Sequence, residues 1–468
     1  MTKNSSAFIW SGIEKIATYL VNIIIQIVLA RLLCPNDYAV VAMLAIFFSI
    51  SQAFIDSGFA TTLIQKQDCT ERDYSSVFFF NILISLLIYC LFYIGAPLIE
   101  DFYNFENLSF VTRIYSLNLL INSFGMIHRV ILTKNLKFKS IAKISVLSSV
   151  FSAIPAIVFA YYGGGYWALV TQSILSSFIT VLLLMQSSKW KPVMVFSKES
   201  LAELAPFGIR MLGVYLFHAV YNNIYSLMIG KKFPSSDLGY YDRGKTLSSM
   251  GPVGFSDFFT RALYPIQSKI QDNREALENS YKKSVSLICL LILPYSAFVF
   301  HFSAEMVHFL YGPKWMECTF ILSCLAIGYM FYPLQALNMN MLQVKARGDY
   351  MLKSESIKKV LGILCVCVTI NFRIEVVIIG WVICSIVEYL ISVYFYVHLY
   401  KISFLPTFKT ICFSVIIAYG LGFLTSGFVD VFSEDLNMRF IIGAFIYFSL
   451  FYILNFRKLR FYVKSALK

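Results

Sequence analysis

The feature that most constrains this chain is a succession of apolar stretches, each long enough to cross a bilayer, joined by short polar connections. An α-helix rises about 1.5 Å per residue, so about 20 apolar residues span the hydrocarbon core of a membrane. Fourteen stretches qualify, at residues 7–33, 38–64, 75–99, 108–132, 140–161, 166–187, 200–229, 238–265, 283–303, 316–343, 355–371, 375–399, 405–426 and 438–456. Because the stretches 355–371 and 405–426 are the weakest, the sequence predicts an all-α polytopic membrane protein with 12–14 transmembrane helices.

Composition agrees with a membrane location. The chain is 58% hydrophobic and only 14% charged, against about 25% charged in soluble proteins, and its mean hydropathy is +0.70. No segment is long and polar enough to form a soluble domain. The first apolar stretch is too long for a signal peptide, so we expect a retained span. The ten cysteines lack the spacing of a zinc site.

The basic residues indicate how the chain crosses the membrane. With the N-terminus in the cytoplasm, 26 of the 39 lysines and arginines fall in cytoplasmic segments, six in outer segments and seven inside spans. Basic residues are enriched in cytoplasmic loops, so this bias predicts that both termini are cytoplasmic. It also explains the formal net charge of +13 without nucleic-acid binding.

A turn between two apolar helices occurs twice, about 200 residues apart in the sequence. In the first copy, Pro35 ends one helix and Asp37 can cap the next, which is predicted to run unbroken over 38–64. Residues 96–103 (APLIEDFY) match residues 304–311 (AEMVHFLY). Further matches pair Asn22, Arg31, Pro35, Asp37 and Asp56 with Asn222, Lys231, Pro234, Asp237 and Asp257. The shared chain direction predicts a parallel repeat, as in transporters built from two halves.

The repeat predicts three parts of the chain. Residues 1–190 form an N-terminal six-helix lobe, residues 191–402 form a C-terminal six-helix lobe, and residues 403–468 form two additional helices with a basic cytoplasmic tail. The boundary between the lobes falls in the polar and basic segment 187–200, which contains Pro192 and is typical of a linker.

Charged side chains inside the predicted spans are the first candidates for function. Each costs a few kcal/mol if it faces lipid, so it should face a cavity or an opposite charge. Snorkelling at a span end is the alternative, and it fits Arg129 better than the mid-span Arg210. Cations would bind an anionic substrate, and acids would balance charge or bind a coupling ion, Na⁺ or H⁺. The substrate-binding candidates are Arg210, Arg261, Arg243, Lys15, Arg113, Asn22, Asn222 and His218, and the charge-balancing or ion-coupling candidates are Glu14, Asp56 and Asp257.

Polar residues also follow single faces of predicted helices. Asn118 and Asn122 share a face of the fourth span, and Tyr215, His218 and Asn222 share a face of the seventh. Such stripes either line a water-filled central cavity between the lobes or form hydrogen bonds that hold the helices together. Arginine suits a phosphate, and tyrosine suits a sugar through its ring face and hydroxyl. The sequence has no nucleotide-binding or hydrolase motif, so we expect no cofactor, no metal and no direct ATP use.

At the repeated turn the chain resembles a known family. The segments LARLLCPNDYAVVAM, FIDSGFATTLIQKQ and APLIEDFY, with the stretch from Asp73 to Asn81, are similar to the polysaccharide transporter family of the multidrug/oligosaccharidyl-lipid/polysaccharide exporter superfamily. The likeness is to lipopolysaccharide biosynthesis proteins of the O-antigen, colanic acid and teichuronic acid flippase type. It covers residues 1–270 well and the remainder by the pattern of spans. Cys34 and Ala39 depart from the usual serine-like residue and glycine, with little consequence expected.

The resemblance implies a flippase, not an enzyme, that moves undecaprenyl-diphosphate-linked oligosaccharide repeat units across the bacterial inner membrane by alternating access. Its products would be O-antigen, capsule or exopolysaccharide. The implied partners are lipid-linked oligosaccharide, membrane lipid, a polysaccharide polymerase and a chain-length regulator. The alternatives are a peptidoglycan-precursor flippase, a cation-coupled drug exporter, which would need an acidic cavity, and a membrane polysaccharide polymerase or glycosyltransferase, which would need a large outer loop.

Overall fold

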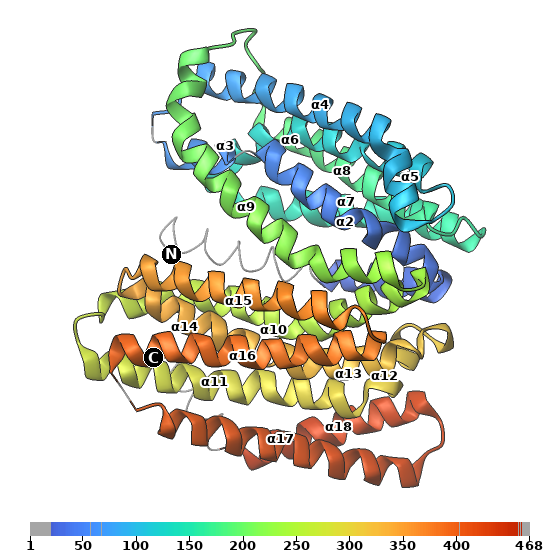
Figure 1. Ribbon diagram of the computed structural model, residues 1–468, viewed down its shortest axis with the longest axis vertical. Helices are drawn as coiled ribbons and strands as arrows, with labels where there is room; N and C mark the ends of the chain where they lie inside the picture. Colours follow the sequence, from blue (N-terminus) through green and yellow to red (C-terminus); the bar gives the residue numbers. More distant parts are fainter. Residues whose placement is uncertain are drawn as a thin grey trace. The chain divides into compact units, whose positions relative to one another are not determined.

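The computed structural model describes residues 20–56, 58–66, 68–401, 403–456, 458 and 460 (Figure 1). This part of the chain consists of α-helices and one short 3₁₀ helix, without a β-strand. The helices form two compact units, unit 1 (Met1–Gly239) and unit 2 (Tyr240–Lys468). The all-α architecture expected from the apolar stretches is confirmed.

Unit 1 begins with the helix Leu20–Leu32. It continues with α2 (Pro35–Asp56), α3 (Phe59–Gln65), α4 (Glu71–Tyr103), α5 (Leu108–Tyr115), α6 (Leu117–Lys134), α7 (Phe138–Tyr161), α8 (Trp167–Ser188) and α9 (Lys198–Lys232). Short polar residues fix the helix starts. The Asp37 carboxylate accepts a hydrogen bond of 2.8 Å from the Cys34 N–H, and Thr70 and Asp73 form a reciprocal capping box at the start of α4.

Helix α9 lies along α2 and also contacts α3 and α4, so its packing places it in unit 1 (Figure 1). The next helix, α10 (Ser235–Lys269), begins at the end of unit 1 and continues into unit 2. This division by packing falls at 239/240. The lobe boundary near 190/191 and the separate segment 403–468 follow from the sequence repeat, and they stay predictions.

Unit 2 continues with further α-helices and one short 3₁₀ helix. The elements are α11 (Arg274–His301), α12 (Ser303–Leu310), the 3₁₀ helix η1 (Pro313–Trp315), α13 (Cys318–Tyr329), α14 (Tyr332–Val344), α15 (Gly348–Thr369), α16 (Ile374–Tyr400), α17 (Leu405–Phe432) and α18 (Leu436–Leu454). Helix α11 contacts α13, α14 and α17, and it supplies much of the core of this unit. Buried polar groups there are paired: the Tyr281 hydroxyl donates to Asn338 Oδ1 at 2.7 Å, and Asn338 Nδ2 donates to Ser392 at 2.8 Å.

The same left-handed turn with a neighbouring lysine contact occurs at equivalent places in both units. Leu136 follows α6 with φ 55°, and Ala346 follows α14 with φ 53°, although this left-handed region is unfavourable for both residue types. Beside each turn a lysine donates to a backbone oxygen at the end of another helix. Lys134 Nζ lies 2.5 Å from Lys66 O, and Lys345 Nζ lies 2.6 Å from Gln271 O. The parallel repeat is therefore visible in the structure as well as in the sequence.

Three predicted spans are each divided into two helices. The span expected over 38–64 is divided into α2 and α3, with Gly58 in the left-handed region at φ 68°. A Cβ at Gly58 would lie 2.3 Å from Gly208 O, so glycine is required here both by φ and by the close approach. The span over 108–132 is divided at Ser116 into α5 and α6, and that over 316–343 is divided between α13 and α14.

Ten segments within the described residues are long and apolar enough to cross a membrane. Expected spans outside this set are the first, of which Leu20–Leu32 is described, and those of α6, α10 and α15. Helices α10 and α15 have 35 and 22 residues, so they are long enough to span but carry several charges. The chain is a multi-pass membrane protein.

Candidate functional site

Unit 1 contains a pocket of about 500 Å³ among α2, α5, α6, α8 and α9. Its lining is apolar in part and otherwise consists of amide and hydroxyl side chains. The lining residues are Phe48, Ser49, Gln52, Ala53, Tyr115, Asn118, Leu119, Asn122, Ser173, Ser177, Tyr215, Ala219, Asn222 and Asn223. None of these described lining residues carries a formal charge. The pocket is therefore polar but electrically neutral.

Helical periodicity brings these side chains together. On α6, Asn118 and Asn122 are four residues apart, and on α8 the same spacing separates Ser173 from Ser177. Residues spaced by three or four positions lie on one face of a helix, so each helix presents a polar face to the pocket. Helix α6 begins at Leu117, directly after the break at Ser116, so Asn118 lies in its first turn.

Hydrogen bonds between helices hold the pocket walls. Asn223 Nδ2 on α9 donates to Ser49 Oγ on α2 at 3.2 Å and to the backbone oxygen of Ala219 at 2.8 Å. The hydroxyls of Tyr215 and Thr61 form a hydrogen bond of 2.9 Å, in which either can be the donor. These contacts hold α9 against α2 and α3, and they occupy some of the hydrogen-bond donors and acceptors that line the pocket.

The side-chain amide of Asn118 has one hydrogen-bond acceptor without a partner. Its Nδ2 donates to the backbone oxygen of Tyr115 at 3.0 Å, which fixes the orientation of the amide. Its Oδ1 is buried without a hydrogen-bond partner, and the residue is only 5% exposed. A buried acceptor without a partner is destabilising, so a ligand that brings a donor would relieve this cost.

Aromatic rings complete one side of the pocket. The rings of Phe48 and Tyr115 meet edge to face with centroids 4.6 Å apart, and Phe92 stacks on Phe48 at 5.3 Å. The Tyr115 hydroxyl accepts a hydrogen bond of 3.4 Å from Ser173 Oγ. The wall thus offers an apolar ring face beside hydroxyl and amide groups, which suits a ligand with both apolar and polar surface.

Four of the predicted cations occupy three different settings. Arg210 on α9 and Arg261 on α10 are exposed. Arg243 is 8% exposed, and its NH2 nitrogen lies 2.5 Å from the Asp242 carboxylate, so its charge is already balanced within α10. Arg113 donates from Nε to the backbone oxygen of Tyr93 at 3.1 Å and lies over the Tyr93 ring at 4.9 Å. None of these four residues lines the pocket.

The other predicted site residues are also dispersed. Asn222 lines the pocket, whereas His218, one turn before it on α9, is exposed and is not among the lining residues. Asn22 and Asp257 are exposed on their helices. Lys15 and Glu14 lie outside the described residues, and Asp56 is the last residue of α2 with no side-chain description.

Sequence reasoning missed two groups. Ser49, Gln52, Ser173 and Ser177 line the pocket, and their spacing of three to four residues on α2 and α8 was an available signal. Lys358 and Lys359 on α15 are each only 5% exposed. Glu355, one turn earlier, forms ion pairs with both, so the two lysines are neutralised in part within their own helix.

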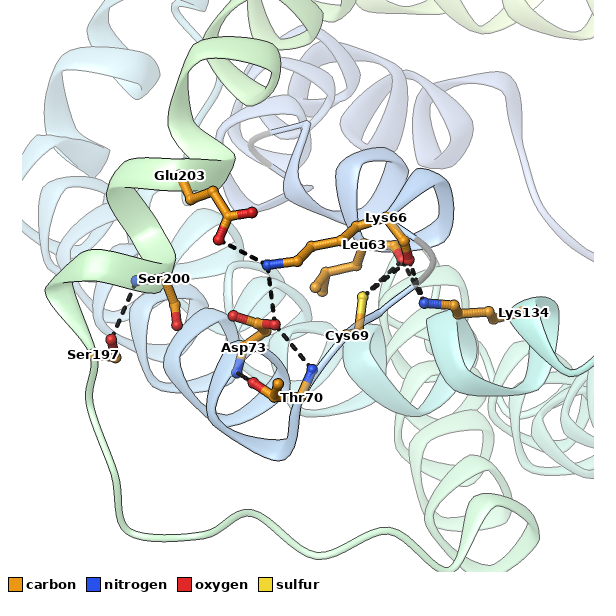
Figure 2. Close-up of polar contacts among 9 residues, drawn as sticks. All are labelled: Leu63, Lys66, Cys69, Thr70, Asp73, Lys134, Ser197, Ser200 and Glu203. Carbon is orange, nitrogen blue, oxygen red and sulfur yellow. Dashed lines mark hydrogen bonds and ion pairs between the residues drawn. The ribbon is translucent and has the colours of Figure 1, made fainter.

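A separate polar network joins the ends of α3, α4 and α9 (Figure 2). Lys66 Nζ lies 3.3 Å from the Asp73 carboxylate and 2.8 Å from the Glu203 carboxylate. The hydrogen bond to Glu203 raises the pKa of the Lys66 ammonium, which stays charged. None of these residues lines the pocket, so the network is a structural tie between helices.

The segment between α8 and α9 is fastened to the same end of α4. Trp190 Nε1 donates to Glu71 Oε2 at 2.6 Å, and the Val193 N–H donates to Ser75 Oγ at 3.0 Å. The Ser197 N–H donates to Ser76 Oγ at 2.8 Å. The segment that the sequence marks as a linker is thus bound to unit 1 along its length.

The fold is that of solved multi-pass transporters. It is similar to the lipid II flippase MurJ in an inward closed conformation, with a TM-score of 0.75 and 14% identity over 96% of this chain and 99% of that one. It is also similar to an inward-facing multidrug resistance MATE family transporter of the MOP superfamily, with a TM-score of 0.62 and 16% identity over 82% and 94% of the two chains. These identities establish the fold class alone.

The chain belongs to the polysaccharide biosynthesis protein family, whose profile matches residues 28–320. It is 25% identical over 445 residues to the teichuronic acid biosynthesis protein TuaB of Bacillus subtilis (strain 168), covering 92% of this chain and 89% of TuaB. It is 22% identical over 367 residues to the lipopolysaccharide biosynthesis protein WzxC of Escherichia coli (strain K12), covering 77% and 74%. The succinoglycan biosynthesis transport protein ExoT of Rhizobium meliloti (strain 1021) is 22% identical over 318 residues, covering 68% and 64%. The family resemblance at the repeated turn is confirmed.

Proposed function

We propose that this protein is a flippase for undecaprenyl-diphosphate-linked oligosaccharide repeat units, used in the biosynthesis of a surface polysaccharide. Its family membership and the transporter fold support this proposal. So do the names of its relatives, which concern teichuronic acid, lipopolysaccharide and succinoglycan. The proposed location is the bacterial inner membrane, with both termini in the cytoplasm, and the proposed mechanism is alternating access without catalysis.

The observation that carries the proposal is the neutral polar pocket inside a membrane-spanning unit. Its amides, hydroxyls and aromatic rings provide the groups that bind sugars, which present many hydroxyls and apolar ring faces. A lipid tail would leave these amides and hydroxyls without hydrogen-bond partners. A drug exporter of this fold that binds organic cations would need carboxylates there, and the described lining has none.

Arg210 is the proposed contact for the diphosphate. It lies 12 residues after the first residue of α9, about 18 Å along the helix, so it is far from the helix start. An arginine at such a depth costs about 2.5–3.5 kcal/mol if it faces lipid, which favours a position at an aqueous path. Its planar fork can bind phosphate oxygens through two charge-assisted hydrogen bonds. Arg261, exposed on α10, is proposed for the same role, and Asp257, Asp56 and Glu14 for charge balance or ion coupling.

Replacement of Arg210 tests the proposal. In a strain that lacks the native gene, Arg210→Ala should reduce surface glycan at least tenfold at an unchanged level of membrane protein, because the diphosphate loses its charged contact. Arg210→Lys should retain intermediate activity, since it keeps the charge but not the fork. The matched control is Arg373→Ala, at the exposed start of α16. Normal glycan in the Arg210→Ala strain would contradict the assignment.

A second candidate is a peptidoglycan-precursor flippase, which the fold similarity to MurJ favours. The two functions differ in what deletion of the gene does to the cell. A flippase for surface polysaccharide should be dispensable for growth, and its loss should remove the surface glycan. Loss of viability on deletion, with rescue by a known lipid II flippase, would establish the second candidate instead.

A further inference from the structure

We propose that the unit 1 pocket is a subsite for uncharged sugar rings that bear hydroxyl or acetamido groups, and that it discriminates against uronic acids. This inference rests on the proposed flippase function, and it deepens that function by naming the class of sugar that the pocket accepts. Relatives of this family act in pathways for quite different glycans, so the lining of this chain's own pocket is where its selectivity can be sought.

The first argument is electrostatic. The described lining contains five asparagine or glutamine amides on α2, α6 and α9, several hydroxyls and no lysine, arginine or histidine. A carboxylate that binds against this lining without a cation loses part of its hydration and gains no compensating charge. The predicted cations do not compensate, because Arg210, Arg243 and Arg113 are not in the lining.

The second argument is the unpartnered oxygen of Asn118. Because Nδ2 already donates to Tyr115 O, the unpartnered Oδ1 needs a donor from another group, and Asn118 is one of the residues that line the pocket. A sugar hydroxyl or an acetamido N–H is a donor, whereas a carboxylate only accepts hydrogen bonds. A uronate carboxylate placed at Asn118 would therefore leave this buried oxygen unsatisfied and set two acceptors against each other.

The third argument is shape. A volume of about 500 Å³ lies within the range of small-molecule pockets and is sufficient for a short saccharide. The edge-to-face pair of Phe48 and Tyr115 provides a ring surface at one side of this space. A sugar ring can place its apolar face on these rings while its hydroxyls reach Asn118, Asn122 and the serines of α8.

Direct binding tests the inference. The full chain is reconstituted in nanodiscs and titrated with the methyl glycosides of N-acetylglucosamine, glucose and glucuronic acid, with saturation-transfer NMR as the readout. We expect millimolar affinity for the first two and at least tenfold weaker binding of glucuronate. Asn118→Leu should weaken binding of the neutral probes at least tenfold, whereas the control Asn371→Leu, exposed at the end of α15, should not.

A charge-introducing variant makes the test independent of folding losses. Asn122→Lys puts a cation into the lining and should strengthen glucuronate binding at least tenfold while the protein remains monodisperse. Equal binding of neutral and acidic probes, or no saccharide binding by a folded protein, would overturn the inference. If these binding results contradict the subsite while the Arg210→Ala strain loses its surface glycan, the flippase function would be supported and only the sugar subsite would be refuted.

Discussion

Two glycines in α17 differ in how much space a Cβ atom would find beside them. A Cβ at Gly422 would lie 2.5 Å from His301 Cδ2, whereas a Cβ at Gly420 would meet nothing within 4 Å. Gly422→Ala should therefore push the His301 ring aside and destabilise the protein by about 1–3 kcal/mol. Gly420→Ala should be neutral or stabilising by up to about 1 kcal/mol, because alanine favours the helix. Thermal unfolding in detergent measures both.

The pair of variants differs by two positions in one helix, so general effects on insertion or expression cancel. A similar change in melting temperature for both variants would show that the contact with His301 does not hold α17 on α11. Gly443→Ala is a second check at α18, since its Cβ would lie 2.3 Å from Phe302 Cε1.

At the residue scale, part of the candidate site could be predicted. The stripes Asn118–Asn122 and Tyr215–Asn222 follow from helical periodicity, and the structure brings all four residues to one pocket. The charges could not be placed in this way, because a sequence shows that Arg243 is inside a helix but not that Asp242 neutralises it. Whether any predicted residue binds substrate stays a prediction.

At the scale of the element, the tie between α3, α4 and α9 should depend unequally on its members. Asp73 is 3% exposed, belongs to the capping box of α4 and contacts Lys66, whereas the Glu203 side chain is 63% exposed. Loss of a cap costs about 0.5–2 kcal/mol, and an exposed ion pair contributes about 0–1 kcal/mol. Asp73→Ala should therefore lower the free energy of unfolding by about 1 kcal/mol more than Glu203→Ala.

Denaturant or thermal unfolding of the two variants, side by side with Lys66→Met, measures this difference. If Glu203→Ala were the more damaging change, the exposed half of the network would be the part that holds α9, and the capping role of Asp73 would be minor. Thr70→Ala provides a control that removes the cap and leaves both carboxylates in place.

Helices could be predicted more reliably than their interruptions. Apolar length located nearly every described helix, but hydropathy does not detect a change of backbone direction inside an apolar run. The break at Ser116 has no proline or glycine beside it, and the left-handed turn before α3 is marked by Gly58 alone. These breaks depend on contacts with other helices, such as the approach of Gly58 to Gly208.

At the scale of the whole molecule, the expected membrane orientation can be measured directly. A fluorescent protein fused to the C-terminus should fold and fluoresce, because it folds in the cytoplasm. Alkaline phosphatase inserted at Gly163, between α7 and α8, should be active, because this turn lies on the outer side in the expected topology. The opposite pattern of reporter activity would reverse the orientation of every span.

The pocket of unit 1 and the core of unit 2 are lined by different kinds of side chain, although the helices of the two units repeat. In unit 2, Asn338 is bonded to Tyr281 and Ser392 within an aromatic core, and a pocket beside Cys289 holds about 10 Å³. In unit 1, the space among α2, α6, α8 and α9 amounts to about 500 Å³. The sequence repeat predicts a similar architecture for both units, but it does not predict the volume of any one pocket, because that volume depends on the summed volumes of side chains from several helices.

Helix α9 bears both Arg210 and the pocket residue Asn222, and their separation has a consequence for cargo length. Twelve helical residues set the two about 18 Å apart along the axis. If the diphosphate of a lipid carrier binds at Arg210 and a sugar binds at Asn222, the distance between the two residues selects for the length of the cargo. A carrier with one sugar would contact only one of these two residues, whereas a finished repeat unit of several sugars would contact both. Incomplete intermediates would then not be transported and would stay on the side of the membrane where they are made.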